Sequence, residues 1–316
     1  MSSTFDFESS LRPLEQELET VRRQARKNGA APEQEARIQA AIEDRLTEIY
    51  RQLTPWQKVQ VARHRERPYA LDYVQWAFSD FVQLHGDRSF GDDRAMVGGP
   101  ALLDGRTVMV IGQQKGRDTR ENIDRNFGMP HPEGYRKAER LMRQADRLGL
   151  PVVTFVDTPG ANATLPDEER GQAEAIASSI ATMLTLRVPT VSVVIGEGGS
   201  GGALAIVVAD RILMLEHAIF TVASPEAAAA ILWRDSSKAP DAAISMKITA
   251  QDLRELGLID EVISEPPGGA HRNHAAAAKA VGEAVGRAIG ELERLGVDER
   301  LDRRYRKYRD IGYFGE

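Results

Sequence analysis

The chain has 316 residues, of which 42% are apolar and 28% charged, and its formal net charge is -6. A chain of this length can bury about 75% of the surface that its unfolded form exposes, so a globular protein with a sizeable core is expected. The acidic balance argues against a dedicated nucleic-acid surface, and the lack of cysteine excludes disulfides, thiolate zinc sites and cysteine nucleophiles.

Neither a targeting segment nor a membrane span is indicated. The residues from Met1 to Pro13 have no basic start and no apolar stretch, and no run approaches the ~18 apolar residues of a span. A soluble, cytoplasmic protein is therefore expected. His271 and His274 lie three residues apart beside Pro266-Pro267-Gly268-Gly269, which indicates a solvated loop rather than a pair of metal ligands.

The N-terminal part is predicted to be helical. Apolar residues recur at helical spacing from Leu11 to Leu53, with a break at Asn28 to Pro32, so a helical hairpin that packs on another helix or a partner chain is expected. Thr54-Pro55 is typical of a helix start. An aromatic-rich helix is predicted from Tyr69 to Leu84, ending near Gly86.

The central part alternates apolar runs with helical patterns, which predicts a parallel or mixed α/β sheet covered on both faces. One long helix is expected from Ala275 to Leu295, and a solvated, arginine-rich helix from Asp298 to Arg309. The predicted strands are Thr107 to Ile111, Val152 to Val156, Val191 to Ile195, Arg211 to Leu215 and Ile219 to Val222, with a strand-like run at Gly257 to Ile263.

The segment from Gly196 to Ala203 is the strongest candidate for a functional loop. It holds five glycines and a serine between an apolar strand and a helix of small residues. Glycine lets the backbone approach a ligand closely, and the first N–H groups of a helix have no internal partner and carry the positive end of the dipole. The segment therefore predicts a binding site for an oxyanion or a phosphate, although tight strand-to-helix packing alone would also use glycine.

Three chemistries compete for this segment. Gly196 to Gly201 satisfies the GxGxxG dinucleotide pattern, with Glu216 as a ribose ligand, but the following helix is short. Gly198 to Gly202 satisfies GxSxG, so Ser200, Asp260 and His271 would give the chain order of a serine hydrolase triad. The third chemistry uses only backbone N–H donors, which stabilise a developing oxyanion without any side chain.

Two further segments carry polar residues. The strand from Val152 ends in Asp157-Thr158-Pro159-Gly160, where Asp157 is equally a turn cap and a pocket wall. The chain contains no Gly-Lys pair, which excludes a nucleotide-hydrolysing P-loop. The connection from Lys115 to Lys137 carries both charge signs, so interleaved surface charge and a phosphate-binding or partner-binding role both stay open.

Long ordered strings resemble the alpha subunits of bacterial acetyl-coenzyme A carboxylase carboxyltransferases, which belong to the crotonase-like superfamily. The resemblance spans most of the chain from Leu53 to Asn273. The strings are LTPWQKVQVARHRERPYALDY, FVQLHGDRSFGDD, GQQKGRDTRENIDRNFGMPHPEGYRKA, ERGQAEAIA, VIGEGGSGGALAI, KITAQDLRELGLIDEVI and PPGGAHRN.

The resemblance implies a crotonase-like α/β core of repeated ββα units, with boundaries at 1–53 for the helical hairpin, 54–273 for the core and 274–316 for C-terminal helices. It implies transfer of a carboxyl group from carboxybiotin, delivered by the biotin carboxyl carrier protein after loading by biotin carboxylase, to acetyl-CoA. The product is malonyl-CoA for fatty-acid biosynthesis. A beta subunit with its own zinc would complete the site in an α2β2 assembly, with no metal in this chain.

The site residues implied by the resemblance lie in the two glycine-containing segments. Gly201 and Gly202 match the oxyanion-hole pair for the biotin carbonyl, with Gly198, Gly199 and Ser200 shaping the approach and no nucleophilic role for Ser200. Asp157 and Gly160 are expected to contact substrate. The stretch from Asn162 to Asp167 departs from the family pattern, which puts pocket shape in question, and Ala227-Ala228 is a change in packing. A serine acyl-hydrolase and a non-catalytic scaffold remain the alternatives.

Overall fold

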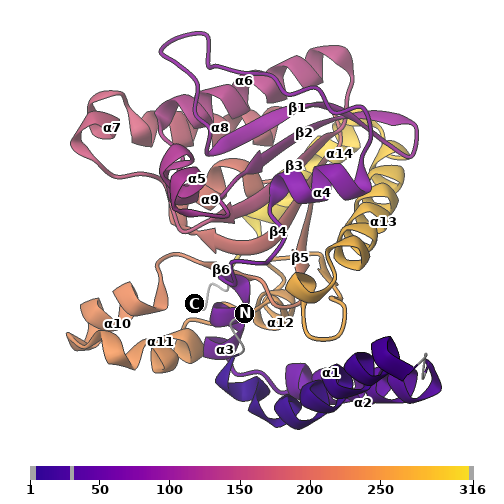
Figure 1. Ribbon diagram of the computed structural model, residues 1–316. Coiled ribbons are helices and arrows are strands. Elements are labelled where there is room, and N and C mark those ends of the chain that lie inside the picture. Colours follow the sequence, from indigo (N-terminus) through magenta and orange to yellow (C-terminus); the bar gives the residue numbers. More distant parts are fainter. Residues whose placement is uncertain (1–4, 29–31, 313–316) are drawn as a thin grey trace.

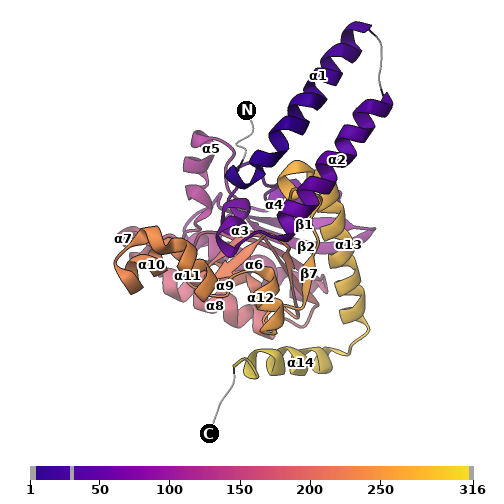
Figure 2. The same cartoon turned by 90° about the horizontal axis from the view of Figure 1, so that it is seen from below.

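The computed structural model describes residues 5–28 and 32–312, which form one mixed β-sheet flanked by helices, with a helical hairpin to one side (Figures 1 and 2). Within the described residues the sheet has seven strands in the order β1-β2-β3-β4-β5-β7, and β6 pairs with the end of β4. Their bounds are β1 Met96–Leu103, β2 Arg106–Gln113, β3 Val152–Thr158, β4 Thr190–Gly199, β5 Arg211–Leu215, β6 Ile219–Thr221 and β7 Glu261–Ile263.

The first two strands form a hairpin, and every other pairing is parallel. Asp104 and Gly105 join β1 to β2 with φ of 49° and 78°. Positive φ at both central residues is what a type I′ turn needs, and this turn matches the twist of the two strands. The predicted strands are confirmed, with β5 at the expected bounds, but β1 was not predicted because Gly98-Gly99-Pro100 are poor strand residues.

Helices cover both faces of the sheet. A side chain at Gly98 of β1 would point at Leu141, whereas one at Gly112 of β2 would point at Ala70, so the two helices carrying those residues lie on opposite faces. The first face is covered by α6 (Pro132–Leu148), α8 (Gln172–Thr185) and α9 (Ser200–Val207), and the second by α4 (Ala70–Ala77) and α13 (His274–Glu293).

The helix predicted from Tyr69 to Leu84 is wrong in length. It ends as α4 at Ala77, after which the chain is extended. The N–H groups of Val82 and Leu84 donate to β1 carbonyl oxygens, those of Pro100 and Gly98, so this stretch follows the open edge of β1. A side chain at Gly99 would meet the Val82 carbonyl oxygen at 1.9 Å, which is why the strand is glycine-rich there.

The predicted N-terminal hairpin is confirmed over the described residues. It consists of the short 3-10 helix η1 (Asp6–Leu11), α1 (Arg12–Asn28) and α2 (Pro32–Arg51), with a small core of its own. That core joins Leu11, Leu46 and Tyr50 to Leu53 and Val61. The predicted break at Asn28 to Pro32 includes residues 29–31, which lie outside the described part of the chain.

The C-terminal helices are anchored more deeply than predicted. The long helix is present as α13, and its apolar face belongs to the main core, so the three-part division at 53 and 273 stays a prediction. The expected solvated helix is α14 (Val297–Arg309), but Arg300 and Arg304 on it are buried. Solvation is therefore wrong for that face: Arg304 pairs with buried Asp210 at 2.7 Å.

Six further α-helices complete the described part of the chain. Thr54 and Ser224 cap α3 and α10 through their side chains, and the helix start predicted at Thr54-Pro55 is confirmed. No helix in the described ranges is long and apolar enough to cross a membrane. The bounds are α3 Pro55–Ala62, α5 Thr119–Asp124, α7 Leu165–Glu169, α10 Pro225–Trp233, α11 Ala239–Ser245 and α12 Ala250–Glu255.

Candidate functional site

The glycine-rich segment is a direct transition from strand to helix rather than a loop. Strand β4 continues through Gly199 and α9 begins at Ser200. The expected loop is therefore wrong in form, because Gly198 and Gly199 are strand residues and Gly201 and Gly202 lie in the first helical turn. Ser200 makes the change of direction with φ of 53°, a strained value for a residue with a side chain.

The turn after β3 explains why two of these positions are glycine. A side chain at Gly199 would lie 2.1 Å from the carbonyl oxygen of Pro159, and one at Gly202 would lie 2.4 Å from the backbone nitrogen of Ala161. The turn from Thr158 to Ala161 is therefore pressed against the start of α9. Two backbone segments from neighbouring parallel strands meet here without intervening side chains.

Gly201 differs from its neighbours because it is open. The nearest atoms that a side chain there would meet belong to Ile176, at 3.8 Å. Gly201 and exposed Ser200 form one wall of a hollow of about 490 Å³. The other walls are mostly apolar, with Leu204 and Phe220 among them, and Thr221 and Lys247 are their polar members.

The start of α9 has the electrostatics of an anion site. Its first N–H groups have no partner within the helix, and the positive end of the helix dipole lies at the same place. An oxygen held there would receive hydrogen bonds from the backbone of Gly201 and Gly202.

Gln113, at the end of β2, hydrogen-bonds to the backbone of both neighbouring segments, the end of β3 and the first turn of α9. Its Nε2 donates to the carbonyl oxygen of Gly202 at 2.7 Å, and its Oε1 accepts from the N–H of Asp157 at 3.1 Å. Gln113 is fully buried. Sequence reasoning missed this residue, although a glutamine that ends an apolar strand was a usable signal.

Asp157 anchors the strand ends. It lies at a bulge between β3 and β4, and its buried carboxylate accepts from the N–H of Glu197 at 2.9 Å and from Lys115 Nζ at 2.6 Å. A side chain at Gly196 would collide with that carboxylate, since Oδ1 would lie at 2.5 Å. Substrate contact by Asp157 stays a prediction, and its hydrogen bonds assign it a supporting role.

Lys115, at the start of the long basic connection, is paired rather than free. Its ammonium contacts Asp157 and, at 3.5 Å, Glu197. Burial by itself lowers the pKa of Lys115, but the two carboxylates outweigh burial and raise it above its ordinary value. Lys137 at the other end of the connection is also buried and pairs with Asp92. The two lysines at the ends of this connection are therefore held in ion pairs and are not free to bind a ligand.

Gly160 serves the shape of the turn. Its φ is 156°, and a side chain there would meet no atom within 4 Å, so backbone conformation alone calls for glycine. Beside this turn lies the hydroxyl of Tyr135, 2.9 Å from where a side chain at Gly202 would begin. That hydroxyl is buried and has no hydrogen-bond partner among the described residues. Sequence reasoning missed Tyr135 as well.

The segment that departs from the family pattern forms its own polar network. Asp167 is fully buried, and its carboxylate accepts from Asn162, from Thr164 and from His131 Nδ1, the last at 2.6 Å. Hydrogen bonds to Thr164 and His131 overcome burial and lower the pKa of Asp167. This network supports the 160–162 turn, because Asn162 donates its N–H to the carbonyl oxygen of Pro130.

The serine hydrolase triad does not assemble. Asp260 accepts from the N–H of Ile212 at 2.7 Å, and Ile212 pairs with Ser192 near the start of β4. Ser200 follows the other end of that strand, roughly 23 Å along the sheet at 3.3 Å per residue. The hypothesis of a catalytic triad in which Asp260 supports Ser200 as the nucleophile is therefore wrong.

His271 is also elsewhere, and the prediction of a solvated loop is wrong for it. Its ring lies against that of His64, with centroids 4.2 Å apart, at the base of the helical hairpin. Burial, followed by the neighbouring charges, lowers the pKa of His271 to about 3. No group of three or more His, Cys, Asp or Glu residues in the described part of the chain is arranged to hold a metal ion.

The dinucleotide-binding hypothesis needs Glu216 beside the glycine-rich segment as a ribose ligand, and Glu216 does not lie there. Glu216 accepts from the N–H of Glu265 at 3.3 Å and lies near the end of β5, while β6 is the strand that pairs beside the glycine-rich segment. Phe220 of β6 fills the space next to Gly198, where a side chain would meet its ring at 2.4 Å. The backbone-donor chemistry is the one of the three that the geometry accommodates.

The chain is similar to known carboxyltransferases in sequence and in fold. Residues 4–312 match the family described as acetyl co-enzyme A carboxylase carboxyltransferase-like. The chain is 52% identical over 311 residues to the acetyl-coenzyme A carboxylase carboxyl transferase subunit alpha of Geobacter metallireducens, covering 98% of each chain. Identity to the subunit of the same name from Thermus thermophilus is 52% over 315 residues, covering 98% of this chain and 99% of that one.

A solved structure of transcarboxylase 12S, with methylmalonyl-coenzyme A and methylmalonic acid bound, shares the fold. Its TM-score is 0.55 at 21% identity, over 67% of this chain and 41% of that one. At this identity the likeness concerns the arrangement of strands and helices alone. It agrees with the crotonase-like α/β architecture that the sequence predicts.

Proposed function

Since this chain belongs to the acetyl-coenzyme A carboxylase carboxyltransferase family, we propose that the start of α9 is the oxyanion site of a carboxyl transfer from carboxybiotin to acetyl-CoA. The chain would act as the alpha-type subunit, and malonyl-CoA would be the product. One observation carries the proposal. Gly201 and Gly202 offer first-turn N–H groups, Gly202 where the backbone of the 158–161 turn excludes a side chain and Gly201 where the hollow is open.

The residues present fit a small neutral ring with a carbonyl group. Carboxybiotin, when bound, supplies the carboxyl group and leaves negative charge on its ureido oxygen as that group departs. The N–H groups of Gly201 and Gly202 donate to this oxygen and stabilise the charge as it develops, an effect worth about 3 kcal/mol per donor in a known oxyanion hole. Gln113 and Asp157 hold the donors in place.

The hollow next to Gly201 supports the same assignment. Its apolar walls suit the hydrocarbon part of such a ligand, and Gly201 is the one glycine of the pair that faces it. Val222 and Leu256 at the rim are 78% and 50% exposed, large values for apolar side chains. We infer that the partner subunit covers this rim and brings acetyl-CoA to the ligand held at α9.

We also propose an assembly for this chain on the basis of its family. A beta subunit would supply the acyl-CoA side and a zinc site in an α2β2 complex, and a biotin carboxyl carrier protein, loaded by biotin carboxylase, would deliver the carboxyl group. The predicted cytoplasmic location stays a prediction.

The deciding experiment changes one N–H group at Gly201. Gly201→Pro removes the donor at a position in the first helical turn, where proline is tolerated, while Gly201→Ala adds a side chain but keeps the donor. With a beta subunit and a biotin donor, malonyl-CoA formation should fall by ~100-fold in the proline variant and by no more than a few-fold in the alanine variant.

Three results would contradict the proposal. Equal activity of the two Gly201 variants, with folding and assembly intact, would refute the donor role. Esterase activity of the chain alone, abolished by Ser200→Ala, would favour the acyl-hydrolase. Unchanged turnover of the complex in the Gly201→Pro variant would leave this chain a scaffold.

A further inference from the structure

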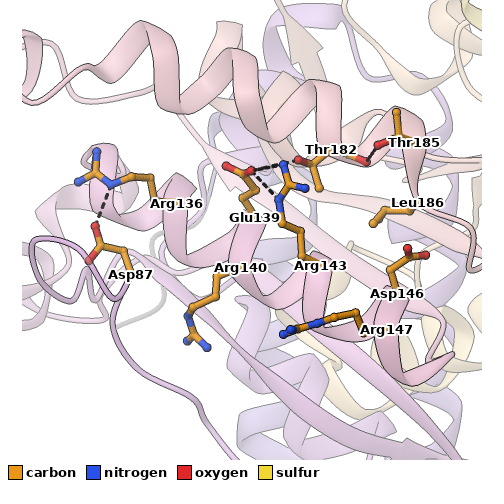
Figure 3. Close-up of a pocket in the computed structure, with 10 residues that line it drawn as sticks. All are labelled: Asp87, Arg136, Glu139, Arg140, Arg143, Asp146, Arg147, Thr182, Thr185 and Leu186. Atoms are coloured by element: carbon orange, nitrogen blue, oxygen red, sulfur yellow. Dashed lines mark hydrogen bonds and ion pairs between the residues drawn. The ribbon is translucent and has the colours of Figure 1, made fainter.

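A polar groove between α6 and α8 lies outside the site described above. Its volume is about 560 Å³, within the range of small-molecule sites, and four arginines of α6 line it. They are Arg136, Arg140, Arg143 and Arg147, and the opposite wall comes from Thr182, Thr185 and Leu186 at the end of α8 (Figure 3). We call this hollow the arginine groove.

The carboxylates of the arginine groove are all engaged. Asp87 pairs with Arg136 at 2.8 Å, and Glu139 pairs with Arg143 at 2.7 Å. Asp146 accepts from the N–H groups of Arg187 and Val188, at 2.6 and 3.2 Å. None of these three carboxylates forms an ion pair with the other two arginines, and the lining carries four arginines against three carboxylates.

Arg140 and Arg147 are those two. Arg140 contacts only carbonyl oxygens, those of Gly86 at 3.0 Å and His85 at 3.3 Å. The side chain of Arg147 makes no hydrogen bond or ion pair with any residue that the structure describes. Figure 3 shows both side chains extending along the same side of the groove, while Arg143 turns the other way toward Glu139. Neither of these two guanidinium groups forms an ion pair with a described residue.

A third arginine converges on the same end. Arg88 Nη1 donates to the His85 carbonyl oxygen at 2.7 Å, the oxygen that Arg140 also contacts. Two guanidinium groups thus crowd around one neutral acceptor. Burial, followed by the charge of Arg88, lowers the pKa of Arg140, and the opposing charges of Asp87 and Asp92 offset this only in part. An anion between these groups would relieve the repulsion.

We propose that the arginine groove binds a small molecule that carries a di- or triphosphate chain. Arg140 and Arg147 are seven residues apart on α6, which places them on one face about 10 Å apart along the axis. A phosphate chain can contact the Arg88–Arg140 pair and Arg147 together, and a single phosphate would contact fewer of these groups. Each planar guanidinium group can donate two parallel hydrogen bonds to phosphate oxygens, so arginine side chains suit a ligand with a phosphate chain.

Titration calorimetry on the full chain tests this proposal, with magnesium-free tripolyphosphate, pyrophosphate and orthophosphate as probes. The two longer probes should bind saturably at physiological ionic strength and orthophosphate at least ~10-fold more weakly. Arg140→Gln combined with Arg147→Gln should weaken tripolyphosphate binding by at least ~10-fold. ADP and coenzyme A, as further probes, distinguish a nucleotide from a coenzyme as the natural source of the phosphates.

The control changes the same amount of charge elsewhere. Arg22→Gln combined with Arg23→Gln alters two exposed arginines of α1, on the hairpin at the far side of the molecule (Figure 1). Tripolyphosphate binding should be unaffected there. Absence of saturable binding to the unaltered chain, equal binding of orthophosphate, or equal weakening by both double variants would overturn the proposal. Carboxyl transfer in the complex should persist in the Arg140/Arg147 variant, so this test is independent of the oxyanion assignment.

Discussion

Gln113 donates a hydrogen bond from Nε2 to the carbonyl oxygen of Gly202 at 2.7 Å, and both residues are buried. This contact couples the end of β2 to the first turn of α9. Since the same side chain accepts from the N–H of Asp157, one residue sets the positions of both backbone segments that form the candidate oxyanion site.

Replacing Gln113 by leucine should lower both stability and turnover. Two buried backbone groups lose their partner, so the free energy of unfolding should fall by about 2–6 kcal/mol, at roughly 1–3 kcal/mol per group. Urea denaturation and malonyl-CoA formation measure the two effects. Gln114→Leu is the matched control, because Gln114 bonds instead to Leu71 and Lys115. A comparable loss of turnover in both variants would contradict a specific role for Gln113.

Arg304→Met should destabilise the fold although α14 lies at the periphery. It leaves the carboxylate of Asp210 buried without its cation and removes donors from the carbonyl oxygens of Met183 and Leu186, so unfolding should become easier by about 3–5 kcal/mol. Arg303→Met on the same helix removes an exposed pair with Glu299 and should cost less than ~1 kcal/mol. Chemical denaturation of both variants checks the contrast, and similar midpoints would refute it.

Tyr135→Phe should stabilise the protein. Removing a buried hydroxyl that has no partner relieves the cost of its desolvation, and the free energy of unfolding should rise by about 1 kcal/mol. Tyr50→Phe provides the opposite case, because the Tyr50 hydroxyl donates to Glu8 at 2.7 Å, and its loss should cost about 1–3 kcal/mol. A destabilised Tyr135→Phe variant would contradict this prediction.

Stability should fall as the solution becomes acidic, through His271. Its pKa is about 3 in the folded protein and about 6.5 when unfolded, so between these values the unfolded chain binds the extra proton. More protons on the unfolded state mean that stability rises with pH in this window, by up to about 1.4 kcal/mol per unit.

The check is the difference between the parent chain and His271→Phe, which keeps a ring against His64 and Phe5. Urea unfolding at pH 5 to 8 should show a shallower acid loss in the variant. Asp93, with its pKa raised to about 6 by burial, contributes the opposite slope in both proteins and cancels in the comparison. Parallel pH profiles would rule out His271 as the source.

The apolar strands were the most predictable part of the fold. Arg211 to Leu215 is a buried run flanked by polar residues, and it forms β5 with the expected bounds. Tertiary contacts explain the failures. Gly98-Gly99-Pro100 forms a strand because the stretch after α4 pairs with its edge, and the same pairing ends the predicted helix at Ala77. Neither effect is visible in local pattern.

For the site, the sequence indicated which residues but not how they are arranged. Glycine density identified the backbone as the reactive surface, yet only the approach of the 158–161 turn separates Gly202, which has no room for a side chain, from Gly201, which does. Gln113, Lys115 and Tyr135 come from other segments, so spacing along the chain could not associate them with α9. The Ser200, Asp260 and His271 order was compatible with a triad until the direction of β4 separated its members.

The open position at Gly201 also makes the site accessible to chemical labelling. The chain contains no cysteine, so Gly201→Cys would carry its single thiol at the mouth of the hollow, with only Ile176 nearby. A fluorophore or a nitroxide attached there would report, as changes in emission or in spin mobility, whether the proposed biotin carrier and partner subunit reach the hollow. A backbone site that is invisible to most spectroscopy would thereby acquire a reporter of its own.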